Sequence, residues 1–182
     1  MQNKTLPGDI NKEKMLDRII RVDHAGEFGA TRIYAGQHAI LKNDDCADTI
    51  KHMAEQEEEH LAYFSKEMVE RKVRPTAMLP IWHVAGFALG AGTALMSKEA
   101  AMACTVAVEE AIDEHYQDQL AKLEDNDDEG ELKAAIEKFR QEELEHRDIG
   151  LEHDAEQAMG YPVLSALIKR GSKAAIWLSQ RI

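Results

Sequence analysis

The chain has 182 residues and a formal net charge of −12, a length that suits one domain with a sizeable buried core. Its acidic balance argues against a nucleic-acid-binding protein, which needs a basic surface. Cys46 and Cys104 are its only cysteines. They are too few for a disulfide framework or a cysteine-based zinc site, and they fit a reducing compartment.

Helix-forming residues are abundant and alternating strand patterns are hard to find, so we predict an all-α protein with a single domain over residues 1–182. The expected helices cover about residues 11–41, 45–72, 76–96, 97–124, 129–155 and 161–180. Residues 43–45 offer an N-cap to the second helix and Ser97 offers one to the fourth, while residues 125–128 form a polar turn. Residues 1–14 resemble neither a signal peptide nor a transit peptide, although a processed mitochondrial chain would have lost its presequence.

Two Glu-x-x-His motifs, Glu57 with His60 and Glu143 with His146, fall in the second and fifth expected helices. Residues three apart on a helix share a face, about 5–6 Å apart at Cβ, so each motif can hold one metal ion. Both motifs interrupt apolar stripes. Because unpaired carboxylates are costly to bury, cations at this place would stabilise the fold.

Glu142 is a geometric rival to Glu143, because it lies four residues before His146. A weak internal repeat favours Glu143, since the position that matches Glu142 in the other motif is Gln56, a poorer ligand.

Each partner helix is expected to supply one further glutamate. Glu27 lies seven residues before Tyr34, and Glu109 lies seven residues before Tyr116. This shared spacing selects Glu109 over Glu110, which is six residues from the tyrosine.

Four glutamates and two histidines in this arrangement are typical of di-iron or di-manganese carboxylate bundles. Carboxylates with few imidazoles suit iron or manganese better than structural zinc. We expect Glu57 and Glu143 to bridge the ions, and Glu27 and Glu109 to cap them. The predicted fold is therefore a ferritin-like four-helix bundle with two additional apolar or amphipathic helices.

Several polar residues near these positions are weaker candidates. His115 and Tyr116 could position a substrate or relay a proton and an electron, and Tyr34 could do the same or simply pack in the core. Asp23, one turn before Glu27, either orients a ligating histidine or is a helix cap or surface acid.

Residues 78–96 carry no formal charge and could reach nearly across a bilayer core. We reject a transmembrane span, because three expected ligands precede the segment and three follow it. Two compatible readings remain: the segment is the crossover between the bundle halves, and it lies in the membrane interface, anchored by Trp82 with Arg74 and Lys98. Residues 161–180 combine apolar and basic residues in a similar way, which favours anionic lipid over ordinary core helices.

The chain resembles the demethoxyubiquinone hydroxylases of ubiquinone biosynthesis over about residues 15–182. The resemblance is carried by residues 21–30 (RVDHAGEFGA), 32–36 (RIYAG), 86–95 (GFALGAGTAL), 101–110 (AMACTVAVEE) and 142–150 (EELEHRDIG). Phe28 stands where many members of that family have tyrosine. The family's ligand positions fall on the six residues selected above, and its His–Tyr pair near the iron falls on His115 and Tyr116.

The resemblance implies that a membrane-embedded polyprenylated methoxy-methyl-benzoquinol is hydroxylated on its ring. Dioxygen, two iron ions and electrons ultimately from NADH would take part. It also implies a peripheral protein at the cytoplasmic face of a bacterial inner membrane or the matrix face of the mitochondrial inner membrane, and a lipid-presenting partner protein.

Three other functions remain as alternatives. A ferroxidase or iron-storage protein is disfavoured by the two apolar and basic segments, and a rubrerythrin-like peroxidase by the missing rubredoxin-type cysteines. A metal-free lipid-binding adaptor would carry no metal after purification.

Overall fold

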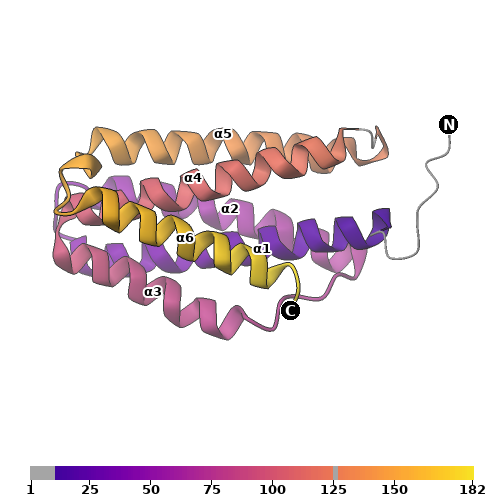
Figure 1. Ribbon diagram of the computed structural model, residues 1–182, viewed down its shortest axis with the longest axis horizontal. Helices are drawn as coiled ribbons and strands as arrows, with labels where there is room; N and C mark the ends of the chain where they lie inside the picture. The colour runs from indigo at the N-terminus through magenta and orange to yellow at the C-terminus, as the bar shows by residue number, and fades with distance from the viewer. Residues whose placement is uncertain (1–10, 125–126) are drawn as a thin grey trace.

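Four long helices run side by side along the long axis of the computed structural model, which describes residues 11–124 and 127–182 (Figure 1). They are α1 (Lys12–Leu41), α2 (Ala47–Arg71), α4 (Lys98–Leu123) and α5 (Gly130–Glu152). Two further helices, α3 (Leu79–Met96) and α6 (Tyr161–Ser179), pack against α1 and α4. Short 3-10 helices lie on either side of α5, at Asp127–Glu129 and Ala155–Gln157. No strand occurs in the described ranges, so the all-α prediction is confirmed and the arrangement fits a ferritin-like bundle with two added helices.

The helix ends differ from the predicted ones by a few residues. Ser97 caps α4 as expected, because its hydroxyl accepts a hydrogen bond from the backbone N–H of Ala100 at 3.1 Å. The residue at the N-cap of α2 is Cys46, and Asp44 stabilises the preceding turn by accepting from the Cys46 N–H at 3.4 Å. The fifth helix ends before residue 155, because Asp154 adopts the left-handed backbone conformation (φ 62°), which does not continue an α-helix. Residues 1–10 and 125–126, on which parts of the N-terminal and polar-turn predictions fall, lie outside the described residues.

Glycines allow α3 to lie directly on α1. A Cβ atom on Gly90 would come within 2.0 Å of the Ile33 carbonyl oxygen, and one on Gly36 within 2.3 Å of the Phe87 carbonyl oxygen. Real side chains cannot approach a backbone so closely, so glycine is required at these two crossings. The glycine-rich pattern of residues 86–95 is therefore a helix-packing feature.

The third helix, Leu79–Met96, is the one helix in the described part of the chain that is long and apolar enough to cross a membrane. It packs on α1 alongside the bundle and runs from the end of the bundle where α2 finishes to the opposite end, where α4 begins (Figure 1). The arrangement therefore fits the predicted crossover between the two bundle halves.

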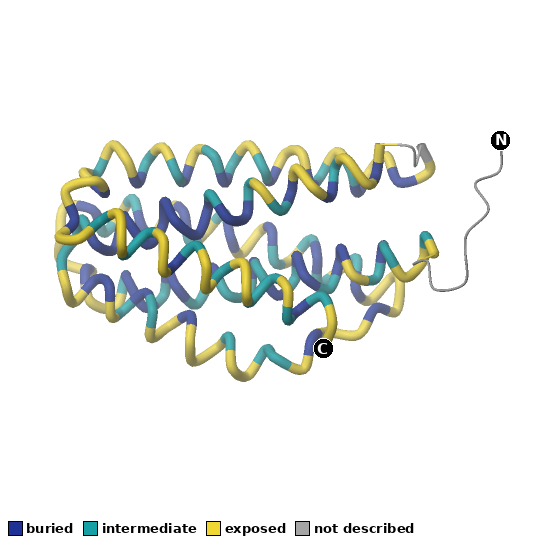
Figure 2. The backbone as a smooth tube through the Cα atoms, in the orientation of Figure 1, coloured by how far each residue is buried: buried dark blue, intermediate teal, exposed yellow. Residues whose placement is uncertain are grey.

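Buried positions lie on the inward faces of the four bundle helices, whereas much of α3 and α6 is exposed (Figure 2). Ile20, Met53 and Ile136 are completely buried. On α3, the buried residues are two glycines, a threonine and an alanine. The bundle helices therefore supply most of the core, and the large apolar side chains of α3 are left for other contacts.

Candidate metal centre

Six acidic and imidazole side chains meet in the middle of the four-helix bundle. They are Glu27 from α1, Glu57 and His60 from α2, Glu109 from α4, and Glu143 and His146 from α5. Each is at most 1% exposed. They form two groups of four residues, and the ligand atoms within each group lie within 4.8 Å of one another. The two groups share Glu57 and Glu143 and differ in the remaining pair, Glu27 with His60 or Glu109 with His146.

The cluster leaves buried polar atoms without hydrogen-bond partners. Both carboxylate oxygens of Glu57 and of Glu143 are buried and unpartnered, as is one oxygen each of Glu27 and Glu109. Charged or polar groups in such a place are costly unless they are paired or bind a metal. The donor set is rich in carboxylates, which hard divalent cations such as ferrous iron or manganese prefer. The residues therefore fit a pair of metal ions.

The two histidines turn the same ring atom toward the cluster. His60 Nδ1 lies 3.2 Å from Glu143 Oε1, and His146 Nδ1 lies 3.2 Å from Glu57 Oε1. The other ring nitrogen, Nε2, points outward and is held by a hydrogen bond. A metal-binding histidine usually has its second nitrogen fixed in this way, so Nδ1 is the atom available to a metal.

The outward bonds come from positions immediately before the motif glutamates. Glu142 Oε2 lies 2.8 Å from His60 Nε2, and Gln56 Oε1 lies 3.0 Å from His146 Nε2. The rival considered in the sequence, Glu142, thus contacts the outer side of a histidine, whereas Glu143 lies inside the cluster. Sequence reasoning missed the role of Gln56, although its match to Glu142 in the internal repeat was the available signal.

A tyrosine holds each of the two glutamates that the groups do not share. The Tyr34 hydroxyl donates to Glu109 Oε1 at 2.8 Å, and the Tyr116 hydroxyl donates to Glu27 Oε1. Both tyrosines are buried, and burial, followed by the neighbouring glutamate, raises the pKa of each well above its usual value. Both hydroxyls therefore stay protonated and remain donors.

The side chains of the cluster also shift one another's pKa. Burial, followed by the charge of Glu143, raises the pKa of Glu57 and Glu109 well above the usual range. Burial alone would lower the pKa of His60, but the neighbouring carboxylates of Glu143 and Glu27 raise it to about 11. Burial would raise the pKa of Glu143, but His146 and His60 outweigh it and lower the pKa to about 2. Metal ions must displace the protons held here, so their binding releases protons.

Comparison with known proteins identifies the family. The family model described as "Ubiquinone biosynthesis protein COQ7" matches residues 14–179. The chain belongs to the COQ7 family.

Similar proteins come from bacteria and from mitochondria. The chain is 57% identical over 178 residues to the 3-demethoxyubiquinol 3-hydroxylase of Rhodospirillum rubrum. The alignment covers 97% of this chain and 83% of the relative. The chain is 57% identical over 169 residues to the mitochondrial NADPH-dependent 3-demethoxyubiquinone 3-hydroxylase of Homo sapiens, covering 92% and 78%. It is 42% identical over 182 residues to the mitochondrial 5-demethoxyubiquinone hydroxylase of Saccharomyces cerevisiae, covering 92% and 78%. The resemblance found in the sequence is thus confirmed.

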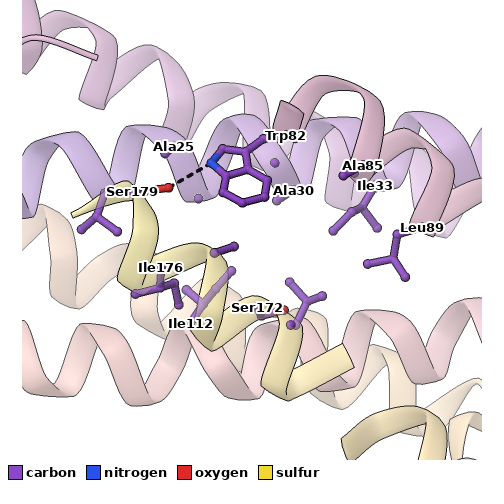
Figure 3. Close-up of a pocket in the computed structure, with 17 residues that line it drawn as sticks. Ala25, Ala30, Ile33, Trp82, Ala85, Leu89, Ile112, Ser172, Ile176 and Ser179 are labelled. Atoms are coloured by element: carbon purple, nitrogen blue, oxygen red, sulfur yellow. Dashed lines mark hydrogen bonds between the residues drawn. The ribbon is translucent and has the colours of Figure 1, made fainter. Parts of the chain in front are cut away.

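This COQ7-family chain has an apolar pocket that is bounded by α1, α3, α4 and α6 (Figure 3). Its volume is about 340 Å³, within the range of ligand pockets. Gly26 and Val108 line it and directly precede Glu27 and Glu109 in the chain. The helices that carry these two glutamates therefore also form the pocket wall.

Trp82, which the sequence suggested as a membrane anchor, is half-buried and lines this pocket. Its indole Nε1 donates to the Ser179 hydroxyl at 2.9 Å and links α3 to α6 (Figure 3). Lys98, expected to anchor beside it, pairs with Asp45 at 2.9 Å. The exposed tryptophan of the two helices is Trp177, with the Arg181 guanidinium 4.1 Å from its ring centroid. The apolar pattern of a helix predicts which of its residues avoid water. It does not predict which neighbouring helix covers them.

Asp23 and His115 lie together beside the cluster. Asp23 is 3% exposed, so it is no surface acid. It accepts a hydrogen bond from Gln119 Nε2 at 2.6 Å and lies 3.7 Å from His115 Nε2. The described hydrogen bonds of His60 and His146 go to other residues, so Asp23 orients neither histidine. Gln119, which also contacts His115 at 2.7 Å, was missed in the sequence because a lone glutamine carries no pattern.

Proposed function

We propose that this chain hydroxylates the ring of a polyprenylated methoxy-methyl-benzoquinol, a demethoxyubiquinol, in ubiquinone biosynthesis. The observation that carries the proposal is the buried cluster of four glutamates and two histidines in a chain of the COQ7 family. The names of the similar proteins give the substrate class and the hydroxylation. The overall reaction consumes dioxygen, two electrons and two protons, and yields the hydroxylated quinol and water.

Two iron ions would be held by the six residues of the cluster. Glu57 and Glu143 belong to both groups of ligand atoms and would bridge the ions, while Glu27 and Glu109 would each cap one. When bound, the iron pair would supply the activation of dioxygen, which no side chain can perform. The tyrosine bonds to Glu27 and Glu109 keep these carboxylates oriented toward the centre.

The apolar pocket would hold the quinol and part of its prenyl tail. The polar side-chain atoms in its lining belong to Trp82, Ser172 and Ser179. An apolar wall excludes water and favours a prenylated ring over a polar substrate. Since α1 and α4 form both the pocket and the metal cluster, a ring bound there lies close to the centre.

The exposed surface of α3 and α6 would dock on the membrane that contains this substrate. Eight of the thirteen exposed large apolar residues described lie on these two helices. They are Ile81, Val84, Phe87, Leu95, Met96, Val163, Leu167 and Trp177. Arg170 on α6 adds exposed positive charge, whereas Lys173 is paired with Glu114. Exposed apolar residues with a basic residue beside them favour an anionic lipid surface. The protein would thus be peripheral, at the bacterial cytoplasmic or mitochondrial matrix face of the inner membrane.

Protons and electrons would reach the centre through His115 and Tyr116. The side chain of His115 is 12% exposed, whereas the neighbouring Tyr116 is buried and bonds Glu27. In this proposal His115 would exchange protons with the surface and Tyr116 would pass them to Glu27. A reduced nicotinamide would be the ultimate electron source. The sequence resemblance implied NADH, whereas the human relative is named NADPH-dependent.

Hydroxylation can be tested with the iron-loaded protein, a short-chain demethoxyubiquinol and ¹⁸O₂. NADH and NADPH would be supplied in separate arms, together with a chemical electron mediator. We expect mass spectrometry to detect a product that carries one ¹⁸O atom. Oxidation and retention of iron without a hydroxylated quinol would contradict the proposal and favour a ferroxidase.

A matched pair of variants tests the pocket in the same assay. Ala175→Trp fills the pocket and is expected to lower turnover with unchanged iron content. Ala174→Trp adds the same ring at an exposed neighbour outside the pocket lining, so its turnover should match that of the unmodified protein.

A further inference from the structure

We infer that Glu142 and Gln56 make the two metal positions unequal, so that the position of Glu27 and His60 binds its ion more tightly than the position of Glu109 and His146. The inference deepens the proposed function and rests on the metal pair proposed there. Glu142 and Gln56 act as positioning residues through the two histidines.

The two residues occupy equivalent places. Gln56 directly precedes Glu57, and Glu142 directly precedes Glu143. Each reaches across from its own helix to the histidine of the other motif, so that α2 and α5 exchange a pair of bonds. The distances are 2.8 Å for His60 Nε2 to Glu142 Oε2 and 3.0 Å for His146 Nε2 to Gln56 Oε1.

The chemistry of the two bonds differs although their geometry matches. A carboxylate accepts a charge-assisted hydrogen bond that is roughly twice as strong as a neutral one, whereas an amide oxygen makes the neutral kind. Lys138 Nζ lies 3.3 Å from the other oxygen of Glu142, an ion pair that fits a charged carboxylate. Partial removal of the Nε2 proton makes the ring more basic at Nδ1. His60 is therefore the stronger donor to a metal ion.

The other hydrogen bonds of the two positions match in kind, while one further contact, between His60 Nδ1 and Glu27 Oε2 at 3.6 Å, belongs to the first position. Each position has one unshared glutamate, and a buried tyrosine hydroxyl holds it. Both positions share Glu57 and Glu143. The difference between a carboxylate and an amide behind the histidine is thus the principal chemical asymmetry in the hydrogen-bond partners of the ligands.

The consequence is an order of filling. The first divalent ion should enter the position of Glu27 and His60, and the second the position of Glu109 and His146. A more basic ligand also stabilises the higher oxidation state, so the first position should hold the more readily oxidised iron.

Cobalt(II), which does not turn over, serves as the probe. Calorimetric titration gives the two dissociation constants, and anomalous diffraction from crystals grown with one equivalent shows which position is filled. The variants are Glu142→Gln, Gln56→Glu and the double exchange of both residues. Exposed carboxylates on the same two helices, Glu145→Gln and Glu59→Gln, serve as controls.

In the unmodified protein we expect two unequal binding steps, with the first ion beside His60. Glu142→Gln should weaken the tighter step about 10- to 100-fold, the usual range for partners of ligating histidines. Gln56→Glu should tighten the weaker step, and the double exchange should move the first ion beside His146. The controls should leave both constants unchanged.

Two results would overturn the inference. The first is that Glu142→Gln binds cobalt with the same two dissociation constants as the control Glu145→Gln. The second is that the protein with both residues exchanged still binds its first ion beside His60. Both leave the proposed hydroxylation intact, since two ions still bind. An unmodified chain that binds no cobalt would overturn the inference and the proposed metal centre together.

Discussion

The Tyr34 hydroxyl on α1 donates a hydrogen bond to Glu109 on α4, at a distance of 2.8 Å. Tyr116 on α4 returns the same kind of bond to Glu27 on α1. Each tyrosine lies seven residues after one glutamate but bonds the glutamate of the other helix. The crossed bonds connect the two halves of the bundle at the cluster of glutamates and histidines.

Removing the Tyr34 hydroxyl should cost stability. In Tyr34→Phe the buried Glu109 loses its partner, and we expect the free energy of unfolding to fall by about 1–3 kcal/mol. Urea denaturation measures the change. Tyr63→Phe is the control, because the described contacts of Tyr63 are ring contacts with Phe64 and Phe139. Equal stability of the two variants would contradict this role of Tyr34.

Shared and unshared glutamates should differ in their effect on metal content. Glu57→Ala removes a ligand from both positions, so the purified protein should retain less than one iron ion per chain. Glu109→Ala removes a ligand from one position and should retain about one. Elemental analysis measures the content, with the exposed Glu58→Ala as control. A full iron complement in Glu57→Ala would speak against the bridging role.

The close contact between α1 and α3 depends on Gly90. A methyl group there meets the Ile33 carbonyl oxygen at 2.0 Å, so Gly90→Ala should lower the free energy of unfolding by about 1–3 kcal/mol, the usual cost of overpacking. Gly92→Ala is the control on the same helix, because its methyl group would meet nothing within 4 Å. Thermal denaturation should show no loss for Gly92→Ala, and a similar loss in both variants would refute the packing argument.

The apolar surface of α3 and α6 should bind anionic lipid. Val84 and Leu167 are 66% and 62% exposed, and replacing both by glutamate should move the protein from the liposome pellet to the supernatant. Val69→Glu on α2, where the side chain is 78% exposed, is the control. Equal sedimentation of all three proteins would exclude this surface as the membrane contact.

Asp23 should make the free energy of unfolding of the metal-free protein depend on pH. Burial raises the pKa of Asp23 from 3.8 to about 6. Between these values the folded state binds the proton more tightly than the unfolded state, so this group lowers the free energy of unfolding as the pH rises. The stability of Asp23→Asn relative to the unmodified protein should therefore increase from about pH 4 to about pH 6 and then level off. Chemical denaturation across this range measures it, and the exposed Asp118→Asn should show no such change.

The sequence by itself indicated the helices and the six residues of the cluster. Helical periodicity places Glu57 and His60 on one face of their helix, and Glu143 and His146 on one face of theirs, independently of the rest of the fold. The paired Glu-x6-Tyr spacing added Glu27 and Glu109. Local rules suffice for such features, because residues a few positions apart on a helix have nearly fixed relative positions.

Tertiary structure alone decided which residues meet across helices. The spacing of residues within α1 and α4 could not show that Tyr34 donates a hydrogen bond to Glu109. The spacing within α2 and α5 likewise could not show that Glu142 forms a hydrogen bond with His60. Residue spacing also could not show that Trp82 bonds Ser179 across two helices. The relative rotation and offset of packed helices follow from the close packing of the whole core, and that information is not present in any single segment of the chain.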